Sequence, residues 1–275
     1  MAVDLDAYFR RIGYAGGRAP TLTTLRAIHA LHPAAIPFES LDPLMGRPVR
    51  LDLASLEAKL VVGRRGGYCF EQNGLLRGVL TALGFTVTPL AARVRWGLAE
   101  DAPPSALSHM LLRVDLAEGP HLVDVGFGGQ SLTAPLRLEN GPEQGTPHGL
   151  YRLVEAAGAH DLQFRLPDRW ATLYRFTQEP RVAADYEVSN WFTSTHPASR
   201  FVNNLIAAKV AGPRRLNLFN AELTTYGPEG AERRLLSGPR EAHEILVRDF
   251  GLAADLAELE GVWGRLPPPE VNSVA

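Results

Sequence analysis

Apolar residues recur at three- and four-residue intervals in the first third of the chain, and this spacing predicts amphipathic helices. Thr21 stands before one such run as a suitable N-cap, and Asp52 or Ser55 can start another. A third run follows Cys69 and ends near Gly84, a suitable C-terminal cap. The apolar positions on these predicted helices are Leu5, Phe9, Ile12, Leu22, Leu25, Ile28, Leu31, Leu56, Leu60, Leu75, Leu76, Val79, Leu80 and Leu83.

The pattern changes from Phe85 onward, where apolar and polar residues alternate and β-branched residues become common. Short segments with this alternation, separated by Gly, Pro and Asn turns, predict strands. A series of such strands is typical of a small barrel or sandwich. The predicted strands cover residues 85–96, 110–116, 121–125, 136–138, 151–155, 162–166 and 173–176.

Pro180 ends this series, and a mixed pattern of helices and strands follows it. The pattern predicts an α+β portion at the end of the chain, because strands and helices both lie there. We expect the tail at 267–275 to be loose. The predicted elements are a helix at 185–195, strands at 207–210, 216–219, 222–225 and 233–236, and helices at 239–250 and 253–262.

The composition of the chain bears on its binding partners and its cellular compartment. The chain has 275 residues, 45% of them hydrophobic, and its 28 basic residues nearly balance 30 acidic ones. A net charge of -2 gives no reason to expect a nucleic acid or an anionic membrane as partner. The single cysteine excludes an internal disulfide, and no leader or long apolar run is visible, so we expect a soluble cytoplasmic protein.

That single cysteine, Cys69, follows Gly66-Gly67-Tyr68 at the start of the third helical run. The unpaired backbone N–H groups and the positive end of the dipole at a helix N-terminus favour a thiolate over a thiol. A lone cysteine is also commonly a small buried hydrophobe. This stretch alone therefore leaves a reactive and a structural interpretation open.

A thiol nucleophile needs a base and a group that orients the base, and His109 and Asp124 are candidates. A turn at 116–119 joining their strands would place His109 opposite Gly126 and diagonal to Asp124, about 7–8 Å apart on one face. A register slip of one residue would put them on opposite faces. Each residue also has a simpler interpretation, His109 as a surface residue and Asp124 as a turn former.

Residues 126–129, Gly-Phe-Gly-Gly, directly follow a predicted strand. Glycines let a backbone approach a ligand closely, and successive N–H groups can form an anion-binding concavity. The pattern is neither a P-loop nor a dinucleotide fingerprint, and a simple hairpin turn is an alternative. The histidines at 29, 32, 121, 148, 160, 196 and 243 lack partners at ligand spacing, so we predict no metal site.

Three stretches stand in this order along the chain: Arg65-Gly66-Gly67-Tyr68-Cys69, then His109, then Asp124-Val125-Gly126-Phe127-Gly128. In residue type, order and spacing they resemble the arylamine N-acetyltransferases. Other positions also look characteristic of that family, namely Pro37-Phe38-Glu39, Asn190-Trp191-Phe192 and Phe201. The resemblance therefore spans almost the entire chain. Tyr68 stands where many members have Trp, and this exchange keeps an aromatic wall.

The resemblance implies an α+β fold with a cysteine-protease or transglutaminase-like core. Its parts would be an N-terminal helical bundle carrying the nucleophile (1–84), a central β-barrel carrying the histidine and the aspartate (85–180), an interdomain helix (181–200) and a C-terminal α/β lid (201–275).

The resemblance also implies roles for single residues. Cys69 would be the nucleophile, His109 the base and Asp124 the residue that orients His109. Glu39 and Arg65 would form a structural ion pair, in keeping with the need of a buried carboxylate for a counter-charge. The implied acceptor pocket is lined by Val94, Phe127 and Phe201, and the implied CoA-binding loop contains Gly126, Phe127, Gly128 and Gly129.

The implied reaction is a ping-pong transfer of an acetyl group from acetyl-CoA, through a Cys69 thioester, to the nitrogen of an arylamine, arylhydrazine or hydrazide. Such a reaction would serve xenobiotic metabolism. The same three residues would suit an amide synthase that releases a polyketide or carrier-bound acyl chain, or a thiol hydrolase. A non-catalytic binding module and a homodimer are further alternatives that the sequence leaves open.

Overall fold

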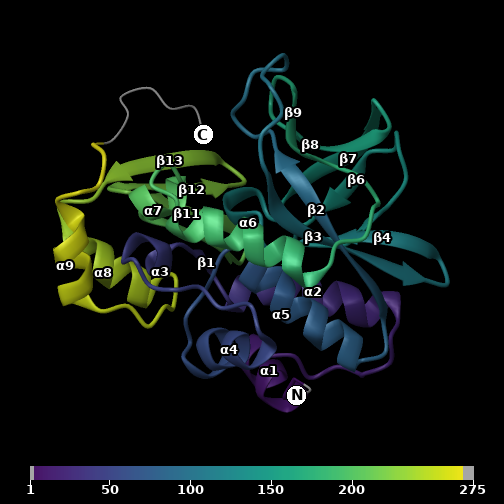
Figure 1. Ribbon diagram of the computed structural model, residues 1–275, viewed down its shortest axis with the longest axis horizontal. Coiled ribbons are helices and arrows are strands. Elements are labelled where there is room, and N and C mark those ends of the chain that lie inside the picture. Colours follow the sequence, from purple (N-terminus) through teal and green to yellow (C-terminus); the bar gives the residue numbers. More distant parts are fainter. Residues whose placement is uncertain (1–2, 269–275) are drawn as a thin grey trace.

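The computed structural model describes residues 3–268 and contains a helical part and two antiparallel sheets (Figure 1). Asp4, Thr21 and Asp52 each accept a hydrogen bond from a backbone N–H in the first turn of their helices, so Asp52 rather than Ser55 is the cap. The helices of this part are α1 (Leu5–Ile12), α2 (Leu22–Ala35), α3 (Leu41–Leu44), α4 (Leu53–Leu56), the π-helix η1 (Glu57–Val62) and α5 (Cys69–Ala82).

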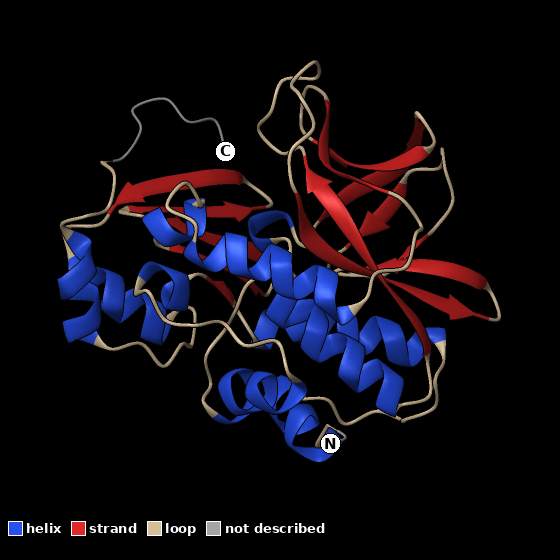
Figure 2. Ribbon diagram, viewed as in Figure 1, coloured by secondary structure: helices blue, strands red, loops and turns tan. Residues whose placement is uncertain are grey.

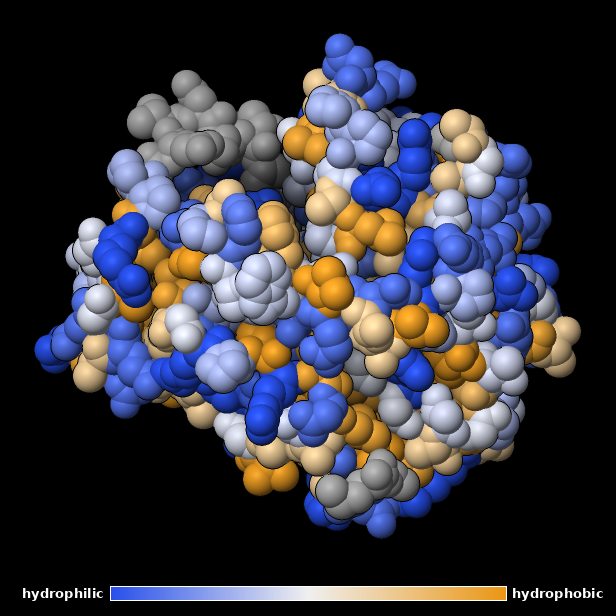
Figure 3. All heavy atoms as spheres, in the orientation of Figure 1, coloured by the Kyte–Doolittle hydropathy of each residue, from blue (hydrophilic) through white to orange (hydrophobic). Residues whose placement is uncertain are grey.

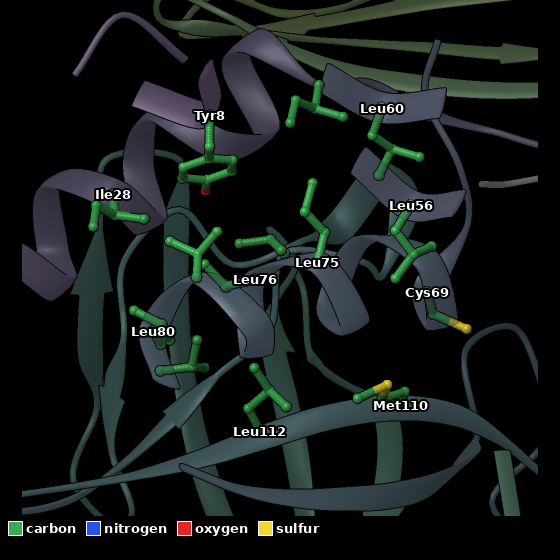
Figure 4. Close-up of a cluster of buried hydrophobic side chains, with 14 of the residues drawn as sticks. Tyr8, Ile28, Leu56, Leu60, Cys69, Leu75, Leu76, Leu80, Met110 and Leu112 are labelled. Carbon is green, nitrogen blue, oxygen red and sulfur yellow. The ribbon is translucent and has the colours of Figure 1, made fainter. Parts of the chain in front are cut away.

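The predicted apolar stripes of these helices meet in one buried cluster. Ile28 of α2 and Leu76 and Leu80 of α5 belong to this cluster, and Leu56 and Leu60 join it from α4 and η1 (Figure 4). All five side chains are almost completely buried. α5 is therefore fixed along its length by packing, which holds its first residue in a set position.

The first sheet has eight antiparallel strands in the order β5-β4-β3-β2-β9-β8-β7-β6. Its outer strands approach each other, since the side-chain amide of Gln144 makes two hydrogen bonds, of 2.7 and 2.9 Å, to the backbone of Arg137. The sheet is thus a nearly closed barrel. Its strands are β2 (Thr86–Val94), β3 (Leu107–Leu116), β4 (Gly119–Val123), β5 (Leu136–Arg137), β6 (Gln144–Thr146), β7 (Gly149–Ala156), β8 (Ala159–Arg165) and β9 (Trp170–Phe176).

The β3–β4 hairpin has the register that the sequence predicts. Leu116 pairs with Gly119 and Leu112 with Val123 across a tight turn. Continuing this register brings His109 opposite Gly126 and diagonal to Asp124.

The second sheet has the order β1-β10-β11-β12-β13, and with α8 and α9 it forms what we call the lid. Figure 2 shows the lid and the barrel side by side, with the long helices of the helical part below the barrel in this view. The two-residue strand β1 comes from the helical part and pairs with β10. The elements are β1 (Phe38–Glu39), β10 (Ile206–Ala211), β11 (Arg214–Phe219), β12 (Glu222–Gly227), β13 (Gly230–Leu235), α8 (Pro239–Arg248) and α9 (Leu256–Trp263). The barrel is joined to the lid through α6 (Ala183–Thr195) and α7 (Arg200–Asn203).

The α+β fold with a helical bundle, a barrel and an α/β lid is confirmed, whereas the likeness to a cysteine-protease core stays a prediction. Some element boundaries were wrong. The last helix starts at Leu256 rather than at 253, because Asp255 caps it by accepting a hydrogen bond of 3.0 Å from the N–H of Glu258. The short elements β1, α3, β6 and α7 carry no periodic pattern and were not predicted. Residues 269–275 of the predicted tail lie outside the described part.

Within residues 3–268, no helix has the length and apolar character needed to cross a bilayer.

Candidate active site

Cys69 is the first residue of α5, with Tyr68 as its N-cap. Figure 4 shows its sulfur pointing away from the leucines of the buried cluster. The side chain is nevertheless enclosed, and Sγ lies 3.6 Å from the backbone oxygen of Ser108 at the start of β3. This placement at a helix N-terminus agrees with the sequence prediction.

The two glycines before Cys69 are required by close approaches of the backbone. A Cβ on Gly66 would overlap the carbonyl oxygen of Pro37. A Cβ on Gly67 would lie 2.5 Å from Oε2 of Glu71, the oxygen that accepts a hydrogen bond from the N–H of Tyr68. Glu71 thus caps the helix that carries the nucleophile, and only glycine leaves room for it.

His109 and Asp124 lie together behind the sulfur. His109 Nε2 is 2.7 Å from Asp124 Oδ2, which leaves Nδ1 of the ring for the sulfur of Cys69. The other carboxylate oxygen accepts hydrogen bonds of 2.9 Å from Asn73 Nδ2 and from the backbone N–H of Gly126. Asp124 is therefore held from three sides, and the orientation of the His109 ring follows from it.

The charges of this group stabilise one another. Burial alone would lower the pKa of His109, but the carboxylate of Asp124 and the sulfur of Cys69 outweigh burial and raise the pKa to about 10. Burial would likewise raise the pKa of Asp124, but the His109 ring, Asn73 and the N–H of Gly126 hold the pKa below its ordinary value. At neutral pH the pair is an imidazolium and a carboxylate.

Aromatic side chains surround His109 and Cys69. Phe127 meets the His109 ring edge-on at 5.1 Å, and Tyr174 of β9 lies 4.9 Å from the same ring. On the other side, Phe201 of α7 packs edge-on against Tyr68, with ring centres 5.5 Å apart. Val94 of β2 is the cross-strand partner of Tyr174, so the two side chains lie on the same face of the sheet.

The glycine loop at 126–129 passes directly over the start of α5. A Cβ on Gly126 would lie 2.8 Å from Cα of Cys69, so only glycine permits this approach. Gly128 has a φ of +77°, in the left-handed region, and begins a single 3-10 turn, Gly128–Gln130. The loop therefore turns away from the nucleophile and toward the lid.

A groove of about 930 Å³ opens beside this loop, between the barrel and the lid. Trp96 and Trp170 line it from the barrel, and Arg215 from the lid, and Gln130 at the end of the glycine loop also lines it. Figure 3 shows one face of the molecule, with the lid on the left and the barrel on the right. Five arginines and three acidic residues line the groove, so its charge suits an anionic ligand.

The predicted ion pair between Glu39 and Arg65 is confirmed at 2.8 Å. It belongs to a buried network, because Arg65 also contacts Asp42, and Lys59 bridges Asp42 and Glu71 at 2.6 Å each. The network joins the loop before Cys69 to β1 and thus to the edge of the lid sheet.

Two residues that hold the site were missed from the sequence. Asn73 stands four residues after Cys69, so helical periodicity places both on one face of α5 and was a usable signal. Tyr174 comes from a strand far along the chain, and its approach to His109 had no local signal. In the part of the chain that the structure describes, no cluster of histidine, cysteine or acidic residues could hold a metal ion.

Comparisons with known proteins agree over most of the chain. A family model described as N-acetyltransferase matches residues 21–259. The arylamine N-acetyltransferase of Mycolicibacterium smegmatis is 47% identical over 95% of each chain, and that of Escherichia coli is 41% identical over 94% of this chain and 92% of that one. The structure of the Mycobacterium marinum arylamine N-acetyltransferase in complex with CoA has a TM-score of 0.93 and 43% identity, and the alignment covers 96% of this chain and 100% of that one.

Proposed function

Since this chain belongs to the arylamine N-acetyltransferase family, we propose that Cys69, His109 and Asp124 are the residues that carry out its reaction. The protein is an acetyl-CoA-dependent acetyltransferase that acts on arylamines. The observation that most strongly supports the residue roles is the placement of His109 between a buried carboxylate and the only cysteine.

In the first half-reaction, the Cys69 thiolate attacks the carbonyl carbon of acetyl-CoA. The negative charge that develops on the carbonyl oxygen can be stabilised by the N–H of Cys69, which has no acceptor within the first turn of its helix. The bond from carbon to the CoA sulfur then breaks, and the departing thiolate takes the proton of His109. The products are an acetyl thioester on Cys69, free CoA and a neutral imidazole.

In the second half-reaction, the amine nitrogen attacks the thioester carbonyl. An arylamine nitrogen is already nucleophilic at neutral pH, so the enzyme mainly has to remove a proton late in the step. Neutral His109 takes that proton while the bond to the Cys69 sulfur breaks. The amide leaves, and the ion pair of thiolate and imidazolium is restored.

Substrates would reach the sulfur from two directions. The glycine loop at 126–129 and the adjoining groove would hold the diphosphate and nucleotide of CoA, because backbone N–H groups and the groove arginines other than the buried Arg215 attract phosphate. Phe127, which contacts His109, and Phe201, which packs on Tyr68, would enclose the aromatic ring of the acceptor together with Val94. These apolar walls would also keep out water that could hydrolyse the thioester.

Initial-rate kinetics tests this proposal. Double-reciprocal plots with acetyl-CoA at several fixed concentrations of an arylamine should give parallel lines, because CoA leaves before the amine reacts. Cys69→Ala should abolish turnover while the protein stays folded. Intersecting lines would contradict a thioester intermediate.

The comparisons favour the acetyltransferase over the amide synthase and the hydrolase, since the relatives are named arylamine N-acetyltransferases. Acyl transfer from a carrier-bound chain, with acetyl-CoA ignored, would favour the synthase. Release of acetate without any amine would favour the hydrolase.

The setting of the enzyme also belongs to this proposal. A catalytic thiol works in a reducing compartment, which supports the cytoplasm. The near-neutral charge gives no support for a nucleic-acid partner. Light scattering in solution would decide between a monomer and the homodimer that the family resemblance left open.

A further inference from the structure

Arg215 crosses from the lid to the glycine loop. It lies on β11, is only 5% exposed, and donates from Nη1 to the backbone oxygens of Gly129 and Ser131 at 3.1 and 2.9 Å. Its Nη2 donates to the hydroxyl of Tyr151 on β7 at 3.1 Å. One buried guanidinium therefore joins the lid sheet, the barrel and the glycine loop.

A small cavity lies where these parts meet. Its volume is about 10 Å³, and Gly128, Gly129, Ser131, Arg215 and Asn217 are among the residues that line it. Among the described residues, three buried polar atoms of this lining have no hydrogen-bond partner: Ser131 Oγ, Arg215 Nε and Asn217 Oδ1. Buried polar atoms are rarely left unpaired, so three around one cavity require an explanation.

The chemistry of these atoms fits one water molecule. Arg215 Nε can only donate a hydrogen bond, Asn217 Oδ1 can only accept one, and Ser131 Oγ can do either. A water can accept from the guanidinium and donate to the amide oxygen and the hydroxyl, which gives it three bonds. The cavity has about the size that one water needs, and three polar partners are the usual number for a buried water. A guanidinium beside the cavity disfavours a metal cation.

We propose that one buried water, held by Ser131, Arg215 and Asn217, acts with the guanidinium of Arg215 to fasten the glycine loop to the lid and so fixes the acetyl-CoA site. This inference rests on the proposed function, because it assigns the loop to CoA. Arg215 and Asn217 are positioning residues that act through the loop.

The contact between Asn217 and the loop supports this arrangement. A Cβ on Gly129 would overlap the side-chain amide of Asn217, so the loop lies directly on β11 at this point. Two carbonyl groups, those of Gly129 and Ser131, depend on Arg215 for hydrogen bonds. Loss of the guanidinium would leave them unpaired and would let the loop move off the lid.

The kinetic test compares Arg215→Met with Arg214→Met, its exposed neighbour on the same strand. We expect Arg215→Met to raise KM for acetyl-CoA by about tenfold or more, since hydrogen bonds to a charged group are lost. The second half-reaction should change little, because the amine enters after CoA has left. Equal KM values for the two variants would overturn the inference.

Because Arg215→Met removes a buried charge and can unfold the protein, KM for acetyl-CoA is also measured in a second variant, Asn217→Leu, which keeps Arg215. Leucine fills a similar volume but cannot accept a hydrogen bond, so KM for acetyl-CoA should rise and kcat should change less. An unchanged KM in this variant would also overturn the inference.

A crystal structure of the whole enzyme, at a resolution that shows ordered waters, gives a readout independent of activity. We expect one water within hydrogen-bonding distance of all three atoms, and its loss in Asn217→Leu. An empty cavity in the wild type, or the three side chains turned to bond one another, would refute the water site. If the wild type releases no CoA on mixing with acetyl-CoA, the proposed function fails, and the crystal structure still decides on the water.

Discussion

Asp124→Asn is the substitution that most specifically perturbs the reaction, because it keeps the shape of the side chain and removes its charge. Oδ1 of Asp124 accepts from both Asn73 and the N–H of Gly126. In the variant the amide oxygen must stay at that position, and the amide NH₂ must then face His109 Nε2. His109 would have to accept there, which puts its remaining proton on Nδ1, so this nitrogen can take a proton neither from the Cys69 thiol before acetylation nor from the amine afterwards.

The expected loss of acetylation rate in Asp124→Asn follows from the charge on His109. With Asp124 present, the pKa of His109 is raised from 6.5 to about 10, so the ring is almost fully protonated near pH 7.5. Without the carboxylate, burial dominates and the pKa falls below the ordinary value of about 6.5. Less than about one tenth of the rings would then be protonated near pH 7.5, and the wrong tautomer adds to this loss. We expect acetylation of Cys69 to slow by about 10²- to 10⁴-fold.

Stopped-flow measurement of CoA release on mixing with acetyl-CoA, from about pH 6 to 10, tests this expectation. The wild-type rate should be nearly flat up to the high pKa of His109, whereas the variant should be slow throughout. Asp115→Asn is the matched control, because Asp115 lies on the same hairpin in a partly exposed pair with Arg113. A variant with the rate and pH profile of the wild type would refute the role of Asp124.

Three further predictions concern the framework around Cys69. Gly66→Ala should destabilise the fold by about 1–3 kcal/mol in urea titrations, because its Cβ would overlap the backbone of Pro37; wild-type stability would contradict the close approach. Burial raises the pKa of Glu71 to about 7 despite its pairing with Lys59, so the folded state binds a proton more tightly than the unfolded state between about pH 4.5 and 7. The wild type should therefore lose stability relative to Glu71→Gln as pH rises through that window, and a constant difference would contradict the raised pKa. Leu76→Ala should cost about 2–5 kcal/mol of unfolding free energy, since this side chain is fully buried; a loss below about 1 kcal/mol would contradict its place in the core.

Much of the fold could be predicted because its signals are local. The helices α1, α2 and α4 have apolar stripes and side-chain caps, and the β3–β4 register follows from a single tight turn after Leu116. The strand β1 could not be predicted in this way. It has two residues, and its pairing with β10 joins positions far apart in the sequence, as Phe38 pairs with Ala208.

The residues of the candidate site likewise differ in whether the sequence carries a local signal for them. Cys69, His109 and Asp124 were found because chemistry limits which residue types can act together, and the hairpin register brings the last two onto one face. Asn73 had a signal in helical spacing. Arg215 had none, because its approach to Gly129 depends on how the lid packs on the barrel, which no local pattern encodes.

The acetyl thioester on Cys69 is the central claim, and intact-protein mass spectrometry tests it most directly. On mixing with acetyl-CoA alone, the wild type should gain one acetyl group, located on Cys69 by peptide mapping, and release one CoA per protein. An arylamine added afterwards should remove the acetyl group and form one equivalent of its N-acetyl derivative. An unmodified Cys69 in a protein that still acetylates arylamines would contradict the account.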